Sequence, residues 1–174
     1  MPDRTPSPSP DEAGMVPVDK AAPNLLTFRI IGLLDLLRRS GALANRREFG
    51  LTGIEWRIMA QVGEHAPLSL NDLTELLNLD AGQLSRTVKA LVERGLLDRR
   101  RRPTGPAIMI TLTGDGRALH ARMMELARDR NGFLVAGLPS EEVAVATRVL
   151  DAVLRNAQLL LEKERTASPP APNS

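Results

Sequence analysis

The sequence predicts a mainly α-helical fold with one short β-hairpin, and three observations lead to this prediction. Apolar residues recur at the helical spacing in six segments between residues 24 and 165. In the stretch AIMITL the spacing changes to every second residue, as in a strand. Prolines gather at the two ends, with six of the 13 in residues 1–23 and three more after residue 168. We therefore expect Pro/Ser-rich disordered tails at 1–23 and 166–174, with one folded part between them.

Composition excludes several classes of site. The chain has no cysteine, which excludes disulfides, thiolate metal sites and thiol redox sensing. Its two histidines, His65 and His120, are far apart in the sequence, so we expect no metal site and no cofactor. Aromatic residues are too few for the stacking platforms that bind single-stranded nucleic acid. Because Lys and Arg (23) nearly balance Asp and Glu (21), a nucleic-acid signal has to come from local clustering.

The first element is an apolar helix within residues 24–50. From Leu25 to Leu37, nine of 13 residues are large and apolar, and Arg29, Gly32 and Asp35 form one thin polar stripe. The run is too short and too interrupted for a membrane span, so no membrane contact is expected. A helix that is apolar on most sides needs more burial than one small domain supplies. We interpret it as a subunit-interface helix.

Three shorter helices follow, and each begins at a side chain that can cap it. Thr52 with Glu55, and Ser69 with Asp72, have the three-residue spacing of a capping box, and Asp80 begins the third helix. The apolar rows of the first and third of these helices predict their buried faces, which are Ile54, Ile58 and Val62 with Trp56 beside them, and Leu84, Val88 and Leu91. The third helix is expected to stop at Gly95, since glycine favours the left-handed cap.

A β-hairpin with a basic connection closes this segment. Ile108, Ile110 and Leu112 alternate with more polar neighbours, as in a half-buried strand. The preceding DRRRRPTGP contains Pro-Thr-Gly-Pro, which predicts a loop tip, and places the arginines at the start of that loop. Three helices and such a hairpin are the outline of a winged helix-turn-helix DNA-binding domain, which we assign to residues 51–113.

Two further helices complete the folded part. One follows Thr113, and the other begins at Ser140 with apolar residues near every 3.5 positions, a spacing that suits packing along a partner helix. We expect residues 24–50 and 114–165 to form a helical dimerisation lobe.

Positive charge is concentrated between Gln83 and Arg102. These twenty residues contain seven basic and two acidic side chains, a net charge of +5, against +2 for the whole chain. Because the apolar row of the third helix points inward, its polar residues face outward, where Arg and Gln can read base edges and Ser and Lys can anchor phosphates. The predicted DNA-binding residues are Gln83, Ser85, Arg86, Lys89, Arg99, Arg100, Arg101 and Arg102.

Two rival functions come from other classes. A winged helix can also act as a protein-interaction module without specific DNA binding, although the outward face of the third helix is neither acidic nor apolar. An enzyme is not expected, because the chain has no nucleophile elbow. The sequence Gly114-Asp115-Gly116 also lacks the surroundings of a phosphate-binding loop.

Four motifs occur in order along the chain: LTGIEWR, LSRTV, RGLL and, after the hairpin, LTGDG. Together they resemble the multiple-antibiotic-resistance regulator (MarR) family over about residues 24–162. The resemblance implies an obligate homodimer whose winged helices bind a pseudo-palindromic operator in double-stranded DNA. It also implies a repressor that a small aromatic or phenolic anion releases, located in the cytoplasm at the nucleoid. The chain departs from the family at the wing tip, where Thr104, Gly105 and Pro106 replace the usual acidic residue and arginine.

The resemblance also implies an effector site at the hinge between the dimerisation lobe and the winged helix. An apolar wall is expected there, with a basic side chain to hold a carboxylate or phenolate. The candidate residues are Phe28, Ile31, Trp56, Met59 and Met123 for the wall, and Arg57 or His65 for the anion. The alternative is that Trp56 and the methionines are ordinary core residues.

Overall fold

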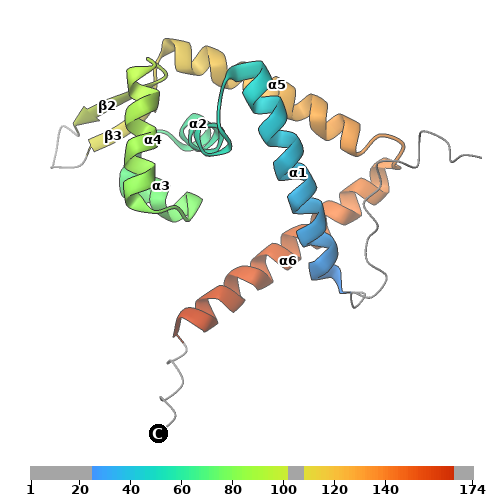
Figure 1. Ribbon diagram of the computed structural model, residues 1–174. Coiled ribbons are helices and arrows are strands. Elements are labelled where there is room, and N and C mark those ends of the chain that lie inside the picture. Colours follow the sequence, from blue (N-terminus) through green and yellow to red (C-terminus); the bar gives the residue numbers. More distant parts are fainter. Residues whose placement is uncertain (1–24, 102–107, 167–174) are drawn as a thin grey trace, which may run out of the picture. The chain divides into compact units, whose positions relative to one another are not determined.

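The structure is a computed structural model, and it describes residues 25–101 and 108–166. Its helices and strands, in order, are α1 (Leu26–Phe49), α2 (Gly53–His65), β1 (Leu68–Ser69), α3 (Leu70–Leu77), α4 (Ala81–Glu93), β2 (Leu97–Arg101), β3 (Ile108–Leu112), α5 (Gly114–Leu134) and α6 (Ser140–Thr166) (Figure 1). The chain divides into two compact units, of which the second begins at Arg117. The predicted tails lie outside the described residues, except that Thr166 is the last residue of α6, and the predicted domain boundaries stay predictions.

The helices of the first unit begin where the capping residues predict. Thr52 and Ser69 each accept a hydrogen bond from the backbone N–H three residues on, and Glu55 and Asp72 accept one in return, so both capping boxes are formed. The carboxylate of Asp80 accepts a hydrogen bond from the Gln83 backbone N–H at 2.8 Å and caps α4. Local hydrogen bonding therefore determines the starts of α2, α3 and α4.

The core of the first unit lies between α2, α3, α4 and the sheet. Leu84, Val88 and Leu91 of α4 are fully buried, as their spacing predicts. On α2, Ile58 and Val62 are buried, but Ile54 is only half-buried and Met59 is fully buried instead. The rest of this core consists of Leu51, Leu68, Leu73, Leu77, Leu97, Ile110 and Leu112.

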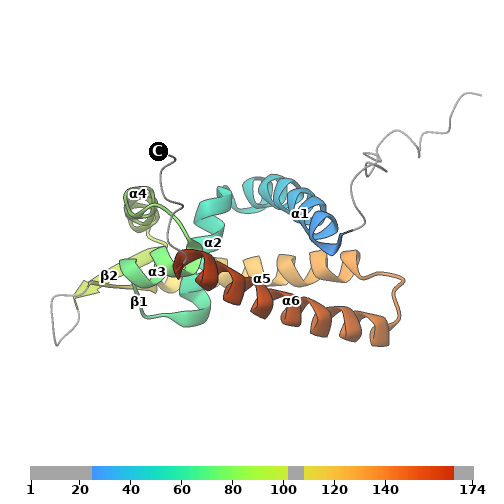
Figure 2. The same ribbon diagram turned by 90° about the horizontal axis from the view of Figure 1, so that it is seen from below.

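The sheet has three antiparallel strands in the order β1–β3–β2. Its outer strands β1 and β2 are labelled in Figure 2. The two-residue strand β1 is too short to show any periodicity, and the sequence did not predict it. Leu97 pairs with Leu112, Arg99 with Ile110 and Arg101 with Ile108. The expectation that the arginines lie in the loop is wrong for Arg99–Arg101, because strand pairing continues to Arg101. The predicted loop tip and Arg102 lie outside the described residues.

Helix α1 in the first unit is long and largely apolar on its exposed sides. It ends at Gly50, whose φ of 62° provides the left-handed cap that glycine adopts without strain. Only Ala44 is buried among its residues. Eight large apolar side chains on or beside α1 are 42–73% exposed, and they are Leu25, Leu26, Phe28, Ile31, Leu33, Leu34, Leu36 and Leu43.

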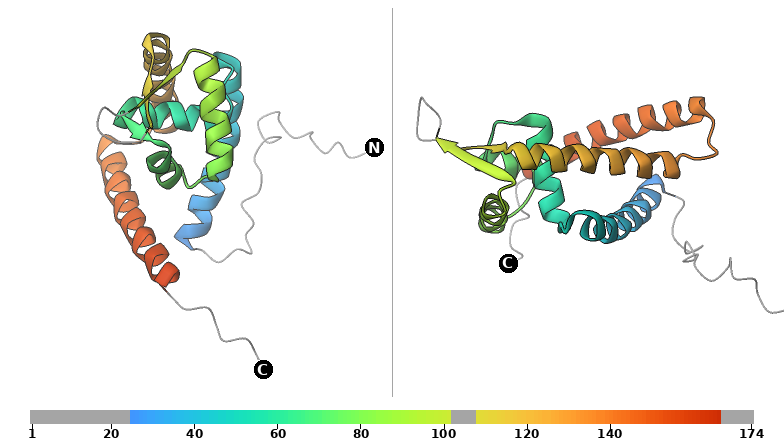
Figure 3. Two further views of the ribbon diagram at one scale, coloured as in Figure 1. Left: turned by 90° about the vertical axis from the view of Figure 1, so that its left-hand side faces the viewer. Right: turned by 90° about the horizontal axis from the view of Figure 1, so that it is seen from above.

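The second unit consists of the remainder of α5 and the 27-residue helix α6, both continuous along their length (Figure 3). No residue of α6 is buried. Large apolar side chains on the two helices are 47–83% exposed, and they are Phe133, Leu134, Val145, Val149, Leu150, Leu154, Leu159, Leu160 and Leu161. Both units thus expose apolar area that a chain in isolation leaves in water.

Candidate nucleic-acid interface

The predicted reading face of α4 is polar and accessible. Gln83, Arg86 and Lys89 are exposed and Ser85 is half-buried, while the opposite side of the helix is in the core. Of these residues, Lys89 has an ion pair with Glu93 at 3.7 Å, in which both side chains are more than 60% exposed. Such a pair contributes little to stability, so it leaves the ammonium group of Lys89 available to a phosphate.

Gly82 leaves room for the capping carboxylate at the start of α4. A Cβ atom at Gly82 would lie 3.1 Å from Oδ1 of Asp80 and 3.5 Å from Nη1 of Arg86. The Arg86 guanidinium group therefore lies along the first turn of the helix, on the side of its cap. This is the end of a helix at which backbone N–H groups also attract phosphate.

The arginines of β2 are divided between the two faces of the strand. Since side chains alternate along a strand, Arg99 and Arg101 share one face and Arg100 has the other. The Nε atom of Arg100 donates to Oδ2 of Asp98 at 2.6 Å, and the Arg100 side chain is 79% exposed. Arg100 is thus oriented by its own strand. Seven of the eight predicted residues lie on α4 and β2 of the first unit, and Arg102 lies outside the described residues.

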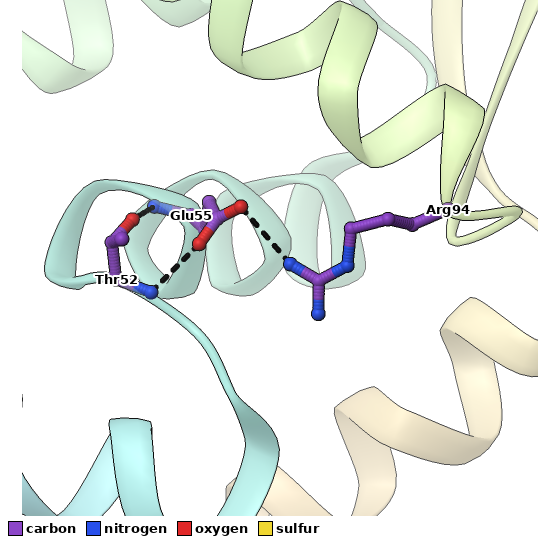
Figure 4. Close-up of polar contacts among 3 residues, drawn as sticks. All are labelled: Thr52, Glu55 and Arg94. Atoms are coloured by element: carbon purple, nitrogen blue, oxygen red, sulfur yellow. Dashed lines mark hydrogen bonds and ion pairs between the residues drawn. The ribbon is translucent and has the colours of Figure 1, made fainter.

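An ion pair that the sequence did not predict connects α2 to the end of α4. The Oε2 atom of Glu55 accepts a hydrogen bond from the Thr52 N–H at 2.7 Å, and Oε1 is paired with Nη1 of Arg94 at 3.0 Å (Figure 4). The Glu55 side chain is only 13% exposed, and that of Arg94 is 39% exposed. One carboxylate therefore caps α2 and also holds the residue that ends α4.

A second polar contact joins α2 to α3. The Nη2 atom of Arg57 donates to the Leu77 carbonyl at 2.8 Å, which satisfies an acceptor at the end of α3. The predicted role of Arg57 was to hold an effector anion. No spacing rule pairs positions 57 and 77, so only the tertiary structure reveals this contact.

The other candidate effector residues differ widely in burial. Phe28 and Ile31 are about half exposed, Trp56 is half-buried and His65 is exposed at the last position of α2. Met59 and Met123 have no exposed area, which is also what the core alternative predicts. Met123 belongs to the second unit and the other six residues to the first. The effector site stays a prediction.

The described residues contain neither a candidate membrane-spanning helix nor a candidate metal site. Within residues 25–101 and 108–166, none of the helices has the length and apolarity needed to cross a membrane. In the same ranges, no group of three or more His, Asp or Glu side chains is placed to hold a metal ion.

Comparison with known proteins finds a matching family model and similar solved structures. The model of the MarR family matches residues 49–105, and no curated protein matches the chain. A MarR/EmrR family transcriptional regulator from Acinetobacter sp. ADP1 is similar in structure, with a TM-score of 0.67 and 24% identity over 76% of this chain and 94% of that one. A probable transcriptional regulator from Pseudomonas aeruginosa has a TM-score of 0.61 and 25% identity over 75% of this chain and 97% of that one. FabT from Streptococcus pneumoniae, in a crystal structure with DNA, has a TM-score of 0.69 and 15% identity over 77% of this chain and 96% of that one.

The helices and the three-stranded sheet of the first unit form a winged helix-turn-helix fold. Residues 49–105 match the model of the MarR family, and the chain has the fold of solved structures of MarR-family proteins. The resemblance found in the sequence and the mainly α winged-helix fold are therefore confirmed. The proteins similar in structure are transcriptional regulators.

The Glu55–Arg94 pair predicts a measurable coupling between α2 and α4. Glu55→Gln keeps an oxygen for the Thr52 N–H but removes the charge, and Arg94→Gln removes the other partner. A double-mutant cycle followed by urea unfolding is expected to give a coupling energy of about 1 kcal/mol, reduced by salt, because the pair is largely shielded on its Glu55 side. The exposed pair of Lys89 and Glu93 is the matched control, with an expected coupling of about 0.3 kcal/mol or less. Equal couplings for the two pairs would contradict a structural role for Glu55.

Proposed function

We propose that the protein is a sequence-specific transcriptional regulator that binds double-stranded operator DNA as a homodimer and acts as a repressor. The observation that carries the proposal is the two-sided chemistry of α4. Its apolar row is fully buried, and its outward side presents Gln83, Arg86 and Lys89. A helix anchored in this way fits the major groove of DNA, and its segment matches the MarR family.

Each part of the proposed interface has a role that its chemistry suits. Arg86 presents the planar fork that binds guanine O6 and N7, and Gln83 has the amide that pairs with adenine. Ser85 and Lys89 would bind phosphates beside them. The arginines of β2 would add phosphate contacts that hold the domain in register without reading sequence. In this proposal α4 determines the sequence specificity, and the phosphate contacts of α4 and β2 together produce most of the salt dependence.

The homodimer is supported by apolar surface that the chain leaves exposed. The large apolar side chains of α1, α5 and α6 named above are 42–83% exposed in the isolated chain. Large exposed apolar patches often mark protein–protein interfaces, and a two-fold interface buries the same patch of both copies. Two copies would also present two α4 helices to the two half-sites of a pseudo-palindrome.

Control by a small aromatic or phenolic anion completes the proposal, and the site of action would be the cytoplasm at the nucleoid. A ligand can release the operator only if it binds better to the DNA-free conformation than to the DNA-bound one. Trp56 is half-buried on α2 and its neighbour Arg57 is exposed, so its fluorescence would report a ligand bound there. The alternative function is a protein-interaction module, for which no sequence-specific DNA binding is expected.

The proposed dimer predicts the mass of the protein in solution. Sedimentation at micromolar concentration is expected to give about twice the chain mass of 18.9 kDa, because association removes exposed leucines from water. Leu154→Glu on α6 is expected to shift the protein towards monomer, whereas Lys163→Glu near the end of the same helix leaves the dimer intact. A clean monomer of the unchanged chain would exclude the proposed assembly.

Operator binding predicts different effects for α4 and β2. Half-site centres are expected to lie about 10–11 base pairs apart, and the logarithm of affinity is expected to fall with log salt at a slope of about −5 to −9. Arg86→Ala is expected to cost about 1–3 kcal/mol and to relax preference at one base pair. The double change of Arg100 and Arg101 to Ala is expected to weaken all sequences alike and to flatten the slope.

The control for these variants is Lys163→Ala, which removes one positive charge at the far end of α6. Competition binding against a library of operator variants measures specificity, and a salt titration measures the slope. If Arg86→Ala keeps the wild-type specificity and weakens binding no more than Lys163→Ala does, α4 does not read the operator.

The effector hypothesis predicts linked changes in fluorescence and DNA binding. A small aromatic acid such as salicylate is expected to change the emission of Trp56, the only tryptophan, and to weaken operator binding over the same concentration range. Linkage requires saturating operator to weaken the affinity for the acid by the same factor. A panel of such acids that changes neither signal would contradict this part of the proposal.

A further inference from the structure

The turn between α4 and β2 is bound to the start of α5 by the residues around Thr113. The Thr113 hydroxyl donates to the Gly95 carbonyl at 2.6 Å, and the Thr113 backbone N–H donates to the Leu96 carbonyl at 3.1 Å. The same hydroxyl accepts a hydrogen bond from the Gly116 N–H at 2.9 Å, which caps the first turn of α5. One side chain therefore joins the two segments, and all of these residues lie in the first unit.

Gly116 makes this approach sterically possible. A Cβ atom at Gly116 would overlap the carbonyl oxygen of Leu96, and would lie 3.0 Å from its carbonyl carbon and 3.3 Å from Oγ1 of Thr113. The obstacle is backbone, which cannot rotate aside as a flexible side chain does. Gly114 lies two residues earlier in the same turn, and a Cβ atom there would meet no other atom within 4 Å. The requirement for glycine is therefore specific to position 116.

The turn on the other side of this contact is itself rigidly attached to α4. Gly95 has a φ of 72°, its N–H donates to the Val92 carbonyl, and the Leu96 N–H donates to the Leu91 carbonyl. This pair of hydrogen bonds is the Schellman motif, which closes the C-terminal end of a helix. The turn that ends α4 and the residue that caps α5 are thus connected by direct hydrogen bonds from Thr113 to the Gly95 and Leu96 carbonyls.

We propose that Gly116 and Thr113 are positioning residues that set the direction of α4 relative to the start of α5. The inference rests on the proposed function, since α5 leads from the winged-helix unit to the proposed dimerisation helices. A helix of 21 residues is about 30 Å long, so a tilt of about 10° at its first turn displaces its far end by about 5 Å. That displacement exceeds the rise of about 3.4 Å per base pair, and the two α4 helices of a dimer would no longer match the half-sites.

Spin-label distances within one chain test the proposal without DNA. The chain has no cysteine, so Glu93→Cys on α4 and Asp129→Cys on α5 place two labels at defined, exposed positions. Mixing labelled chains with an excess of unlabelled chains keeps the measured distance within one chain. Gly116→Ala is expected to shift the mean label distance by about 3 Å or more, or to broaden the distance distribution, because the first turn of α5 tilts. Gly114→Ala, the matched control, is expected to leave both unchanged.

Operators of varied half-site spacing test the consequence for DNA binding. Gly116→Ala is expected to lose at least tenfold in affinity for the best wild-type operator and to move or flatten the spacing optimum, while sedimentation still shows the wild-type assembly. A merely destabilised protein would keep the same optimum with a smaller active fraction. Gly114→Ala is expected to stay within twofold of wild type at every spacing.

Thr113 provides a second pair of variants if Gly116→Ala does not fold. Thr113→Val removes the hydroxyl and is expected to broaden the label distance, and Thr113→Ser keeps it and is expected to restore the wild-type distance. The proposal is overturned if Gly116→Ala matches Gly114→Ala, or if Thr113→Val matches Thr113→Ser, in both measurements. If the label distances respond as expected but the unchanged chain prefers no DNA sequence, the proposed function fails and the positioning role in the fold stands.

Discussion

The closure of the C-terminal end of α4 is the constraint on which the winged-helix unit depends. A helix leaves its last carbonyl groups without donors inside the helix. Here the Gly95 turn closes the helix on itself, Thr113 binds the Gly95 and Leu96 carbonyls, and Arg94 is paired with Glu55. The starts of α2 and α5 and the first residue of β2 are fixed at the same place. The polar side of α4 is therefore presented from a rigid base.

Sequence reasoning predicted most where structure depends on neighbours three or four positions apart. The capping boxes at Thr52 and Ser69, and the buried row of α4, follow from such spacings, and all are present. It failed where the determinant is long-range. Strand pairing across the hairpin brings Arg99–Arg101 into β2, although proline and glycine beyond them favour a loop. The partners of Glu55 and Arg57 are 39 and 20 positions away, and no local pattern marks them.

The candidate interface shows the same division. Composition and spacing indicated which side chains leave the core, but they treated the basic run of β2 as one cluster. The pleat of the strand separates it into two faces, and Asp98 orients Arg100 on one of them. Only part of that positive charge can therefore meet a single DNA backbone at once. On α4, Arg86 and Lys89 lie on the side opposite the buried row, whereas Gln83 and the half-buried Ser85 lie on its two flanks.

The exposed surface of α6 links the packing of one chain to the assembly of two. A 27-residue helix with no buried residue gains little tertiary packing within its own chain, yet most helical stability in proteins comes from such packing. Its exposed leucines have to be covered for the helix to be stable in water, and in the proposed dimer the second copy covers them. Formation of α6 and formation of the interface are then one process, governed by protein concentration. In the proposed dimer, α5 would lead from this interface to the turn at Gly116, and the same association would then bring two copies of α4 to one DNA.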